Sequence, residues 1–214
     1  MKSLLTLLTM LAVFAIPATS FASFDDELAR IQSDWAVANY GTADKKAALA
    51  AFESLAERSH ALAEANPQRA EPLVWEGIVL SSWAGKKGGL GALGLAKQAR
   101  EVLEEARRLD ASVLKGSVYT SLGALYYKVP GWPVGFGDDD QAAEYLAQAL
   151  QMNPDGIDPN FFYGDFLLEQ GQEAEARAYL EKALAAPARP GRELADEGRR
   201  DEIRQRLASL SSSG

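Results

Sequence analysis

Apolar residues recur every three to four positions along most of the chain, and this spacing is typical of amphipathic helices. The short runs of valine and phenylalanine also fit a helical period better than the alternation of a strand. Proline and glycine stand at interruptions of the pattern, where they mark turns. The pattern predicts nine helices and no strand, with the helices near residues 24–40, 43–65, 69–83, 92–109, 112–128, 139–152, 158–170, 173–186 and 192–209.

A repeated set of small and large residues runs through these predicted helices. Each copy has an alanine, a larger residue four positions later and an alanine three positions after that. Two copies begin at Ala142 and Ala176, which are 34 residues apart, and this is the period of tetratricopeptide (TPR) repeats. The copies are Ala99, Leu103 and Ala106; Ala142, Leu146 and Ala149; Ala176, Leu180 and Ala183; and, more weakly, Ala56, His60 and Ala63.

Glycines in the preceding helices complete the repeat and indicate how its helices pack. Gly77, Gly123 and Gly164 each stand in the first helix of a unit, so the alanine-bearing second helix can approach closely at these positions. We therefore predict an all-α fold, an α-solenoid of about four TPR-like helical hairpins plus a C-terminal capping helix. Charged residues such as Arg199 and Glu202 are expected to keep the outer face of that last helix in water.

Two of the predicted hairpins carry extra residues at the turn between their helices. Because both insertions occupy the same topological place, we expect both to project from one edge of the solenoid, where insertions often build a binding face. The first contains Trp83, Lys86 and Lys87 beside a run of glycines, and the second contains Trp132 and Phe136 in a loop rich in proline and glycine. The rings either form a local core under the loop or wall a hydrophobic cleft.

The glycine run of the first insertion spells a GxGxxG pattern at Gly89, Gly91 and Gly94. A dinucleotide site needs this pattern at a strand-to-helix turn of a parallel sheet, whereas here a helix precedes it and no βαβ unit is present. The run is therefore interpreted as a flexible turn that leads into a helix. The alternative is that its amides, with Lys86 and Lys87, hold a carboxylate or sulfate.

Carboxylates beside the predicted turns favour helix capping over metal binding. The run of aspartates from Asp138 to Asp140 stands where a helix begins, so these carboxylates can cap amides and complement the helix dipole. Asp155 and Asp158, on either side of Gly156, indicate turn and cap chemistry in the same way. Their spacing matches no calcium-binding loop, and we predict no metal site.

The remaining candidate side chains do not combine into a catalytic set. His60, the only histidine, takes the groove-filling place of the weak repeat and is predicted to be a partly buried packing residue with no partner. Arg189 and Arg192 precede the last helix, where they either clamp an anion or pair with Asp196 and other acids. Because no nucleophile motif or acid–base pair is recognisable, we predict no catalytic residue, no cofactor and no enzyme activity.

The first residues are typical of a signal peptide. Lys2 precedes an apolar run at residues 4–16, and small residues lead to a cleavage point after Ala22. An uncleaved N-terminal anchor is the alternative, and no later stretch is long and apolar enough to cross a membrane. We therefore expect residues 1–22 to be a signal peptide, residues 23–210 a single TPR-like α-helical domain and residues 211–214 a disordered tail.

Composition narrows the compartment and the class of partner. The chain contains no cysteine, so it has neither disulfides nor the thiol that anchors a bacterial lipoprotein. Because the signal peptide directs export and the chain has no cysteine for a lipid anchor, the predicted location is the periplasm, with the signal peptide cleaved and no lipid anchor. A formal net charge of −8 repels phosphate backbones, and we predict no nucleic-acid binding.

Three stretches together resemble the T component of TRAP transporters, the TatT-like family. They are residues 121–138 (SLGALYYKVPGWPVGFGD), residues 88–94 and residues 153–165 (NPDGIDPNFFYGD). The resemblance implies an extracytoplasmic α-solenoid, sometimes a homo-trimer, that binds the transporter's solute-binding component and holds a small hydrophobic molecule in a cleft. The described T components are lipoproteins, which this chain cannot be. The positions that match the family's loop are Tyr126, Tyr127, Pro130, Trp132, Pro133 and Gly137.

Two functions follow, together with one set of candidate ligand-binding residues. The leading prediction is a periplasmic TPR-like accessory protein of a TRAP-type transport system, which binds a small hydrophobic or amphipathic ligand, the solute-binding component, or both. The alternative is a structural TPR scaffold for protein–protein interaction in the cell envelope. The candidate ligand-binding residues are Trp83, Lys86, Lys87, Tyr126, Tyr127, Trp132, Phe136 and Tyr163.

Overall fold

The computed structural model describes residues 23–212, and within this range it contains nine α-helices, one short π-helical segment and no strand. The predicted signal peptide lies outside the described residues. None of the described helices is long and apolar enough to span a membrane. The elements are α1 (Phe24–Ala36), η1 (Val37–Gly41), α2 (Lys45–Ala65), α3 (Ala70–Lys87), α4 (Leu90–Asp110), α5 (Val113–Lys128), α6 (Asp139–Met152), α7 (Ile157–Glu169), α8 (Glu173–Leu184) and α9 (Glu193–Ser212).

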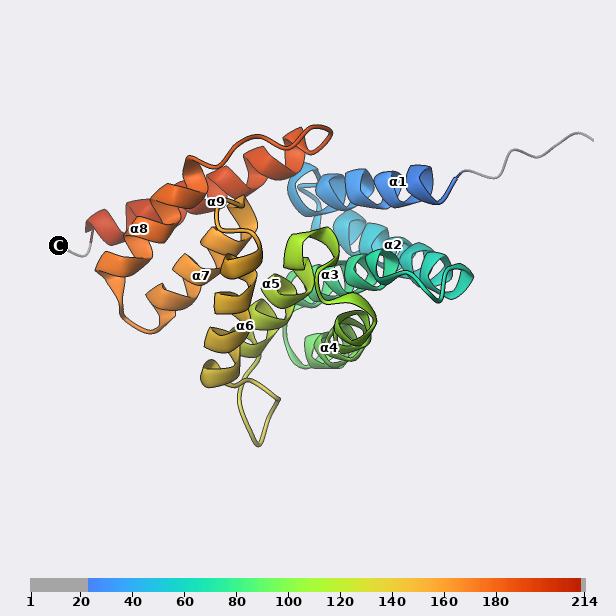
Figure 1. Ribbon diagram of the computed structural model, residues 1–214, viewed down its shortest axis with the longest axis horizontal. Coiled ribbons are helices and arrows are strands. Elements are labelled where there is room, and N and C mark those ends of the chain that lie inside the picture. The colour runs from blue at the N-terminus through green and yellow to red at the C-terminus, as the bar shows by residue number, and fades with distance from the viewer. Residues whose placement is uncertain (1–22, 213–214) are drawn as a thin grey trace, which may run out of the picture.

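The helices pair into four hairpins, α1 with α2, α3 with α4, α5 with α6 and α7 with α8, and each hairpin packs on the next (Figure 1). The predicted all-α TPR solenoid is therefore confirmed. Its packing rule also holds, because a Cβ added at Gly77 would lie 2.4 Å from Leu103 and one at Gly123 would lie 2.6 Å from Leu146. Only glycine lets these helices approach closely enough for the leucines to fill the groove between them.

The first insertion lengthens two helices instead of forming a loop. Helix α3 continues to Lys87 and α4 begins at Leu90, so the turn between them contains only Gly88 and Gly89. Both glycines have positive φ angles, 67° and 64°, which glycine adopts without steric cost. The expected flexible turn is thus two residues long, and two glycines of the GxGxxG pattern, Gly91 and Gly94, lie inside α4.

The weak first repeat is predicted in the wrong register. The groove-filling residues of α2 are Phe52, Leu55 and Ser59, which are buried, whereas His60 is exposed. His60 also has a partner, contrary to the prediction, because its Nδ1 lies 2.9 Å from Oε1 of Glu76. The buried residues Ala48, Phe52 and Leu55 repeat the spacing of Ala99, Leu103 and Ala106, and they begin eight positions before the predicted copy at Ala56.

Helix α5 departs from the continuous helix predicted from its sequence. Leu114, Lys115 and Gly116 all have left-handed backbone angles, with φ of 51°, 55° and 73°. Each left-handed non-glycine residue costs about 1–2 kcal/mol, so the surrounding packing holds this turn in place. At Gly116 an added Cβ would lie 2.5 Å from Sδ of Met152, which shows how closely α6 covers the turn.

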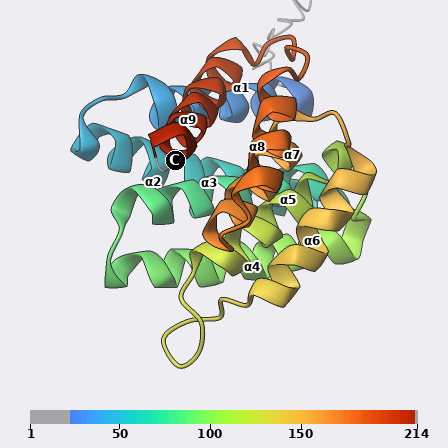
Figure 2. The ribbon, with the colours of Figure 1, turned by 90° about the vertical axis from the view of Figure 1, so that its left-hand side faces the viewer.

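The last helix packs on α8, as predicted for a cap, and also returns to the first hairpin (Figure 2). Tyr40 of η1 lies against α9, where a Cβ added at Gly198 would be 2.3 Å from its ring. The Tyr40 hydroxyl donates a hydrogen bond to Glu202 at 3.4 Å. Helix α9 therefore joins the two ends of the solenoid. It extends to Ser212, two residues beyond the predicted end of the domain.

The charges of α9 are only partly on its outer face, which corrects the prediction for this helix. Arg199 and Asp196 are buried, although Arg200, Asp201 and Glu202 stay partly or fully exposed. A buried charge is tolerated when it is paired and hydrogen-bonded, and both residues have such partners in the cavity described below.

Candidate functional site

A cavity of about 610 Å³ lies between the first helices of the hairpins and the segment that leads into α9. Helices α1, α3, α5 and α7 each contribute to its wall, so it is formed only when all four hairpins are stacked. Pro187, Arg189, Arg192 and Arg199 contribute a further part of the wall. Its lining includes Trp35, Trp75, Ile78, Ser82, Leu114, Lys115, Thr120, Asn153, Asp155, Asp158, Phe162, Arg189, Arg192 and Arg199.

Two indole rings form the aromatic wall of the cavity. Trp35 of α1 and Trp75 of α3 meet edge to face with their centroids 5.8 Å apart, which is a favourable geometry for aromatic pairs. The indole N–H of Trp35 donates to Oγ of Ser82 at 2.9 Å. In contrast, Nε1 of Trp75 is buried and has no hydrogen-bond partner among residues 23–212.

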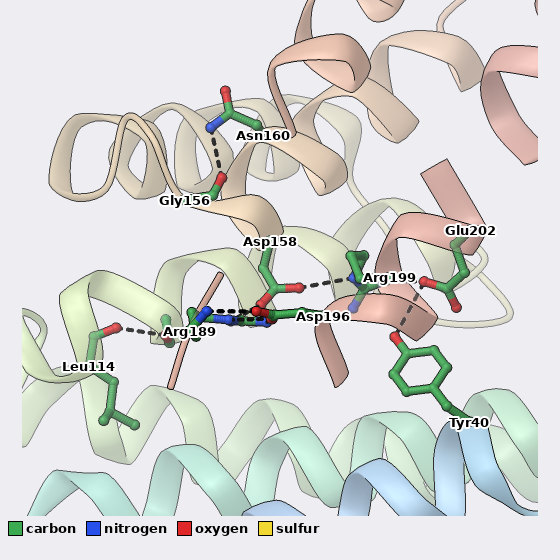
Figure 3. Close-up of polar contacts among 10 residues, drawn as sticks. Tyr40, Leu114, Gly156, Asp158, Asn160, Arg189, Asp196, Arg199 and Glu202 are labelled. Atoms are coloured by element: carbon green, nitrogen blue, oxygen red, sulfur yellow. Dashed lines mark hydrogen bonds and ion pairs between the residues drawn. The ribbon is translucent and has the colours of Figure 1, made fainter. Parts of the chain in front are cut away.

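An ion cluster ties α7 to the segment before α9, and Figure 3 shows its side chains. Asp158 accepts from Nη1 of Arg189 at 2.7 Å and from Nε of Arg199 at 2.9 Å. Arg189 also pairs with Asp196, Nη2 to Oδ1, at 2.6 Å. Burial alone raises the pKa of Asp158, but the charges of Arg199 and Arg189 outweigh burial and lower that pKa to about 2. The cluster therefore stays ionised over the physiological range.

Sequence reasoning predicted one ion pair of this cluster and missed the others. Pairing of Arg189 with Asp196 was one of its two alternatives, and the structure contains that pair. Asp158 was interpreted as a turn and cap residue; it does lie in the first turn of α7, but its carboxylate faces residues more than 30 positions away. No local spacing reveals such a contact.

Arg192 differs from its neighbour Arg189, because its side chain makes no ion pair within the described part of the chain. Its guanidinium carbon lies 4.8 Å from the centroid of Trp75 and 5.8 Å from that of Trp35. Its Nε is buried without a hydrogen-bond partner. Burial, and after it the charge of Arg189, lower the pKa of Arg192, yet a guanidinium remains protonated in proteins. The predicted acid pairing is therefore wrong for this arginine.

The left-handed turn at the start of α5 forms another part of the wall. Leu114 (labelled in Figure 3) and Lys115 both line the cavity, and Oγ of Ser117 donates to the carbonyl of Leu114 at 2.7 Å. Lys115 makes no ion pair with any described residue. Strained backbone of this kind clusters at binding sites, and here it places a cation at the wall of the cavity.

The second insertion forms an ordered loop outside the cavity, residues 129–138, which projects from the end of the α5–α6 hairpin in both views (Figures 1 and 2). Its base is held by hydrogen bonds from the amide of Gly137 to Pro130 at 3.0 Å and from Asp138 to Tyr126 at 2.9 Å. The Asp138 carboxylate caps α6, as predicted, by accepting from the amide of Gln141.

The two rings of this loop point in different directions. Phe136 packs edge to face on Tyr126, with centroids 5.5 Å apart, and Arg100 of α4 lies 4.4 Å from its centroid. Trp132 is 90% exposed at the tip, beside Val134 at 58%. Phe136 therefore fits the predicted local core, whereas Trp132 faces solvent and fits neither the local core nor the wall of a cleft.

The other predicted ligand-binding residues have structural contacts. Tyr127 is buried and donates to Asp165 at 2.9 Å; burial and then the charge of Asp165 raise its pKa. Tyr163 packs on Tyr179 with centroids 4.6 Å apart. Trp83 is half-buried, with Lys87 5.6 Å from its ring, and Lys86 donates to the carbonyl of Asn39.

None of the eight predicted residues belongs to the lining of the cavity. The structure brings Tyr126 together with Phe136, and it places Tyr127 and Tyr163 against the same ring, Phe166. The insertions do approach one another, since a Cβ at Gly135 would lie 3.4 Å from Leu93 of α4. Ligand contact by these eight residues stays a prediction. The cavity is lined instead by other residues, among them part of the stretch 153–165 and Arg189 and Arg192, for which the sequence predicted turn, cap, anion-binding or ion-pair roles.

Comparison with known proteins supports the TPR class. A family model of the tetratricopeptide repeat matches residues 135–192. A thermophilic TPR protein of Thermus thermophilus has a similar structure, with a TM-score of 0.55 and 18% identity, over 85% of this chain and 98% of that one. The protein MamA gives a TM-score of 0.45 at 19% identity, over 79% and 92%. No curated protein sequence matches the chain.

The repeat match and the shared fold define a TPR-type protein. TPR-type solenoids are in general non-catalytic scaffolds that bind protein partners, which agrees with the more general of the two predicted functions. The matches do not extend to the T component of TRAP transporters, and a role in TRAP-type transport stays a prediction.

Proposed function

We propose that this protein is a TPR-type interaction scaffold that holds a protein partner through the loop of residues 129–138. The observation that supports this most directly is the 90% exposure of Trp132 at the tip of a hydrogen-bonded loop. Tryptophan is enriched among the residues that dominate binding energy at protein interfaces. Because the loop is already ordered, little conformational entropy is lost when a partner docks on it.

The partner that we propose is the extracytoplasmic solute-binding component of a TRAP-type transporter. Two features support this: the resemblance of residues 121–138 and 153–165 to the T component, and the signal-like segment at residues 1–22. Export to the periplasm without a lipid anchor, and assembly as a homo-trimer, belong to the same proposal.

The test measures binding between the purified chain and a purified solute-binding component of a TRAP transporter from the same organism, by biolayer interferometry. Trp132→Ala is expected to weaken binding at least tenfold, because a hot-spot truncation costs 2 kcal/mol or more. The matched control is Leu109→Ala, which removes a 43% exposed side chain near the C-terminal end of α4. This change is expected to alter affinity less than twofold.

The outcomes separate the general function from its context. If the solute-binding component does not bind, while another envelope protein binds the wild type and not the Trp132→Ala variant, the scaffold is supported and the transporter is excluded as its context. If Trp132→Ala changes the binding of no partner that the wild type captures, the loop is not the interaction surface.

A further inference from the structure

Two buried N–H groups of residues that line the cavity have no acceptor among residues 23–212. They are the indole N–H of Trp75 and the Nε–H of Arg192. Trp75 is only 4% exposed, so bulk water does not readily reach its indole. A buried polar group without a partner costs about 1–3 kcal/mol, and such groups in native proteins call for an explanation. Both belong to residues that line the same cavity.

The two donors belong to neighbouring side chains. The guanidinium carbon of Arg192 lies 4.8 Å from the centroid of the Trp75 ring, and both residues line the cavity. The neighbouring acceptors have other hydrogen-bond partners. Asp158 pairs with Arg189 and Arg199, and Asp196 pairs with Arg189. Ser82 accepts from Trp35.

The charge around these donors favours an anion. Arg192 and Lys115 both line the cavity without an ion pair inside the described range, although the chain as a whole has a formal net charge of −8. Asp155 and Asp158 line the same cavity and would repel a group with two negative charges. A carboxylate satisfies both conditions, because it has a single charge and two oxygens for the two donors.

The rest of the lining describes the body of the ligand. Ile78, Leu114, Phe162 and the two indole rings offer apolar contact, while the hydroxyls of Ser81, Ser117 and Thr120 can meet polar substituents. The volume of about 610 Å³ is within the usual range for small-molecule pockets, roughly 300–1,000 Å³. Residues of the segment before α9 contribute a further part of the wall, which suits a compact molecule better than a chain that runs through a groove.

From these observations we infer that the cavity is a binding site for a small organic monocarboxylate with a partly apolar body. Arg192 and the indole N–H of Trp75 hold the carboxylate, and Trp35 and Phe162 contact the body. This site contains no residue of the loop at 129–138, so its test is independent of the test of the proposed protein partner.

The test uses isothermal titration calorimetry with the full chain and three acids, phenylacetate, octanoate and gluconate, each paired with its neutral amide. At least one acid is expected to bind at least tenfold more tightly than its amide, because the amide keeps the shape and loses the charge. Arg192→Gln is expected to weaken that acid at least tenfold. Arg108→Gln, the same change at an exposed arginine outside the cavity, is expected to leave its affinity unchanged.

A second variant keeps the inference testable if Arg192→Gln does not fold, which thermal unfolding would show. Trp75→Phe retains a ring and removes only the N–H, and it is expected to weaken the acid several-fold. The inference is overturned if no acid binds at millimolar concentration, if acid and amide bind equally, or if both cavity variants bind like the wild type. Tighter binding of a peptide with a free C-terminal carboxylate than of every small acid would also overturn it, because the site would then belong to a polypeptide.

Discussion

The projecting loop and the cavity both contain tryptophan, but they hold it in opposite ways. Trp132 is 90% exposed on a loop that is held by backbone hydrogen bonds within residues 126–138. Trp75 is buried between helices of different hairpins, next to an arginine more than 100 positions away. A surface suited to a large partner can thus be built by one short segment, whereas the cavity around Trp75 requires helices of all four hairpins.

The greatest loss of stability is expected when the shared carboxylate of the ion cluster at the cavity wall is removed. Asp158→Asn removes the carboxylate shared by Arg189 and Arg199 and leaves the buried Arg199 and the partly exposed Arg189 without that partner. Loss of one member of a buried pair costs about 3–5 kcal/mol, and partial exposure of Asp158 favours the lower end. We expect a loss of about 3 kcal/mol in the free energy of unfolding, measured with urea.

The matched control for this variant is Asp155→Asn, three residues earlier in the same wall. Asp155 has an 81% exposed side chain and only a distant pair with Lys182 at 3.4 Å, so its loss is expected to change stability by less than about 0.5 kcal/mol. Equal losses in the free energy of unfolding for the two variants would show that the ion cluster of Asp158 does not stabilise the fold.

Acid titration measures how much the ionised carboxylate of Asp158 contributes to stability. The pKa of Asp158 is about 2 in the folded protein, below the usual value of about 3.9, so ionised Asp158 stabilises the fold above about pH 4. This contribution disappears as the pH falls from about 4 to 2. Over that interval the wild type is expected to lose roughly 2 kcal/mol more stability than Asp158→Asn, as measured by urea unfolding at each pH. Parallel pH profiles would contradict a lowered pKa at this residue.

Much of the fold could be predicted because its rules are local. The spacing of alanine, leucine and alanine, with a glycine in the partner helix, places Leu103 against Gly77 without knowledge of the remaining chain. His60 is the exception that shows the limit of the rule. Its helix keeps the small residues but uses Phe52 as the groove-filling residue, so the pattern of alanines alone gives the wrong register.

The cavity could not be predicted, because its parts come from α1, α3, α5, α7 and the segment before α9. Arg189 and Arg192 lie three residues apart in one turn, and the sequence gives both the same set of possible partners. Arg189 meets Asp158 whereas Arg192 lies against the indoles, and their positions in the sequence do not distinguish these partners. The aromatic loop was visible in the sequence, although not the opposite orientations of Phe136 and Trp132.

The next prediction concerns the contact of α9 with Tyr40, through which the last helix meets the first hairpin. Gly198→Ala places a Cβ 2.3 Å from the ring of Tyr40, and overpacking of this kind costs about 1–3 kcal/mol. Hydrogen exchange at the amides of α9 is expected to become faster, together with a loss of stability of about 2 kcal/mol. Gly94→Ala in α4, where no atom lies within 4 Å of the added Cβ, is the control and is expected to gain about 0.5–1 kcal/mol. A stable Gly198→Ala variant with unchanged exchange would show that α9 does not need this contact.

The smallest expected effects distinguish the two rings of the projecting loop. Phe136→Ala removes the ring that packs on Tyr126 and lies beside Arg100, so it is expected to cost about 1.5 kcal/mol, less than a fully buried phenylalanine. Trp132→Ala removes a side chain that faces solvent and is expected to change stability by less than about 0.5 kcal/mol. Both values are measured by urea unfolding.

This pair of variants decides whether the loop is a platform or a core element. If Trp132→Ala leaves stability unchanged while it abolishes partner binding, the tryptophan is maintained for recognition and Phe136 holds the loop in place for it. A loss of stability from Trp132→Ala as large as that from Phe136→Ala would instead mean that the indole packs against the protein in solution. In that case the loop and the cavity would no longer differ in how they hold their tryptophans, and the loop would lose its support as an interaction surface.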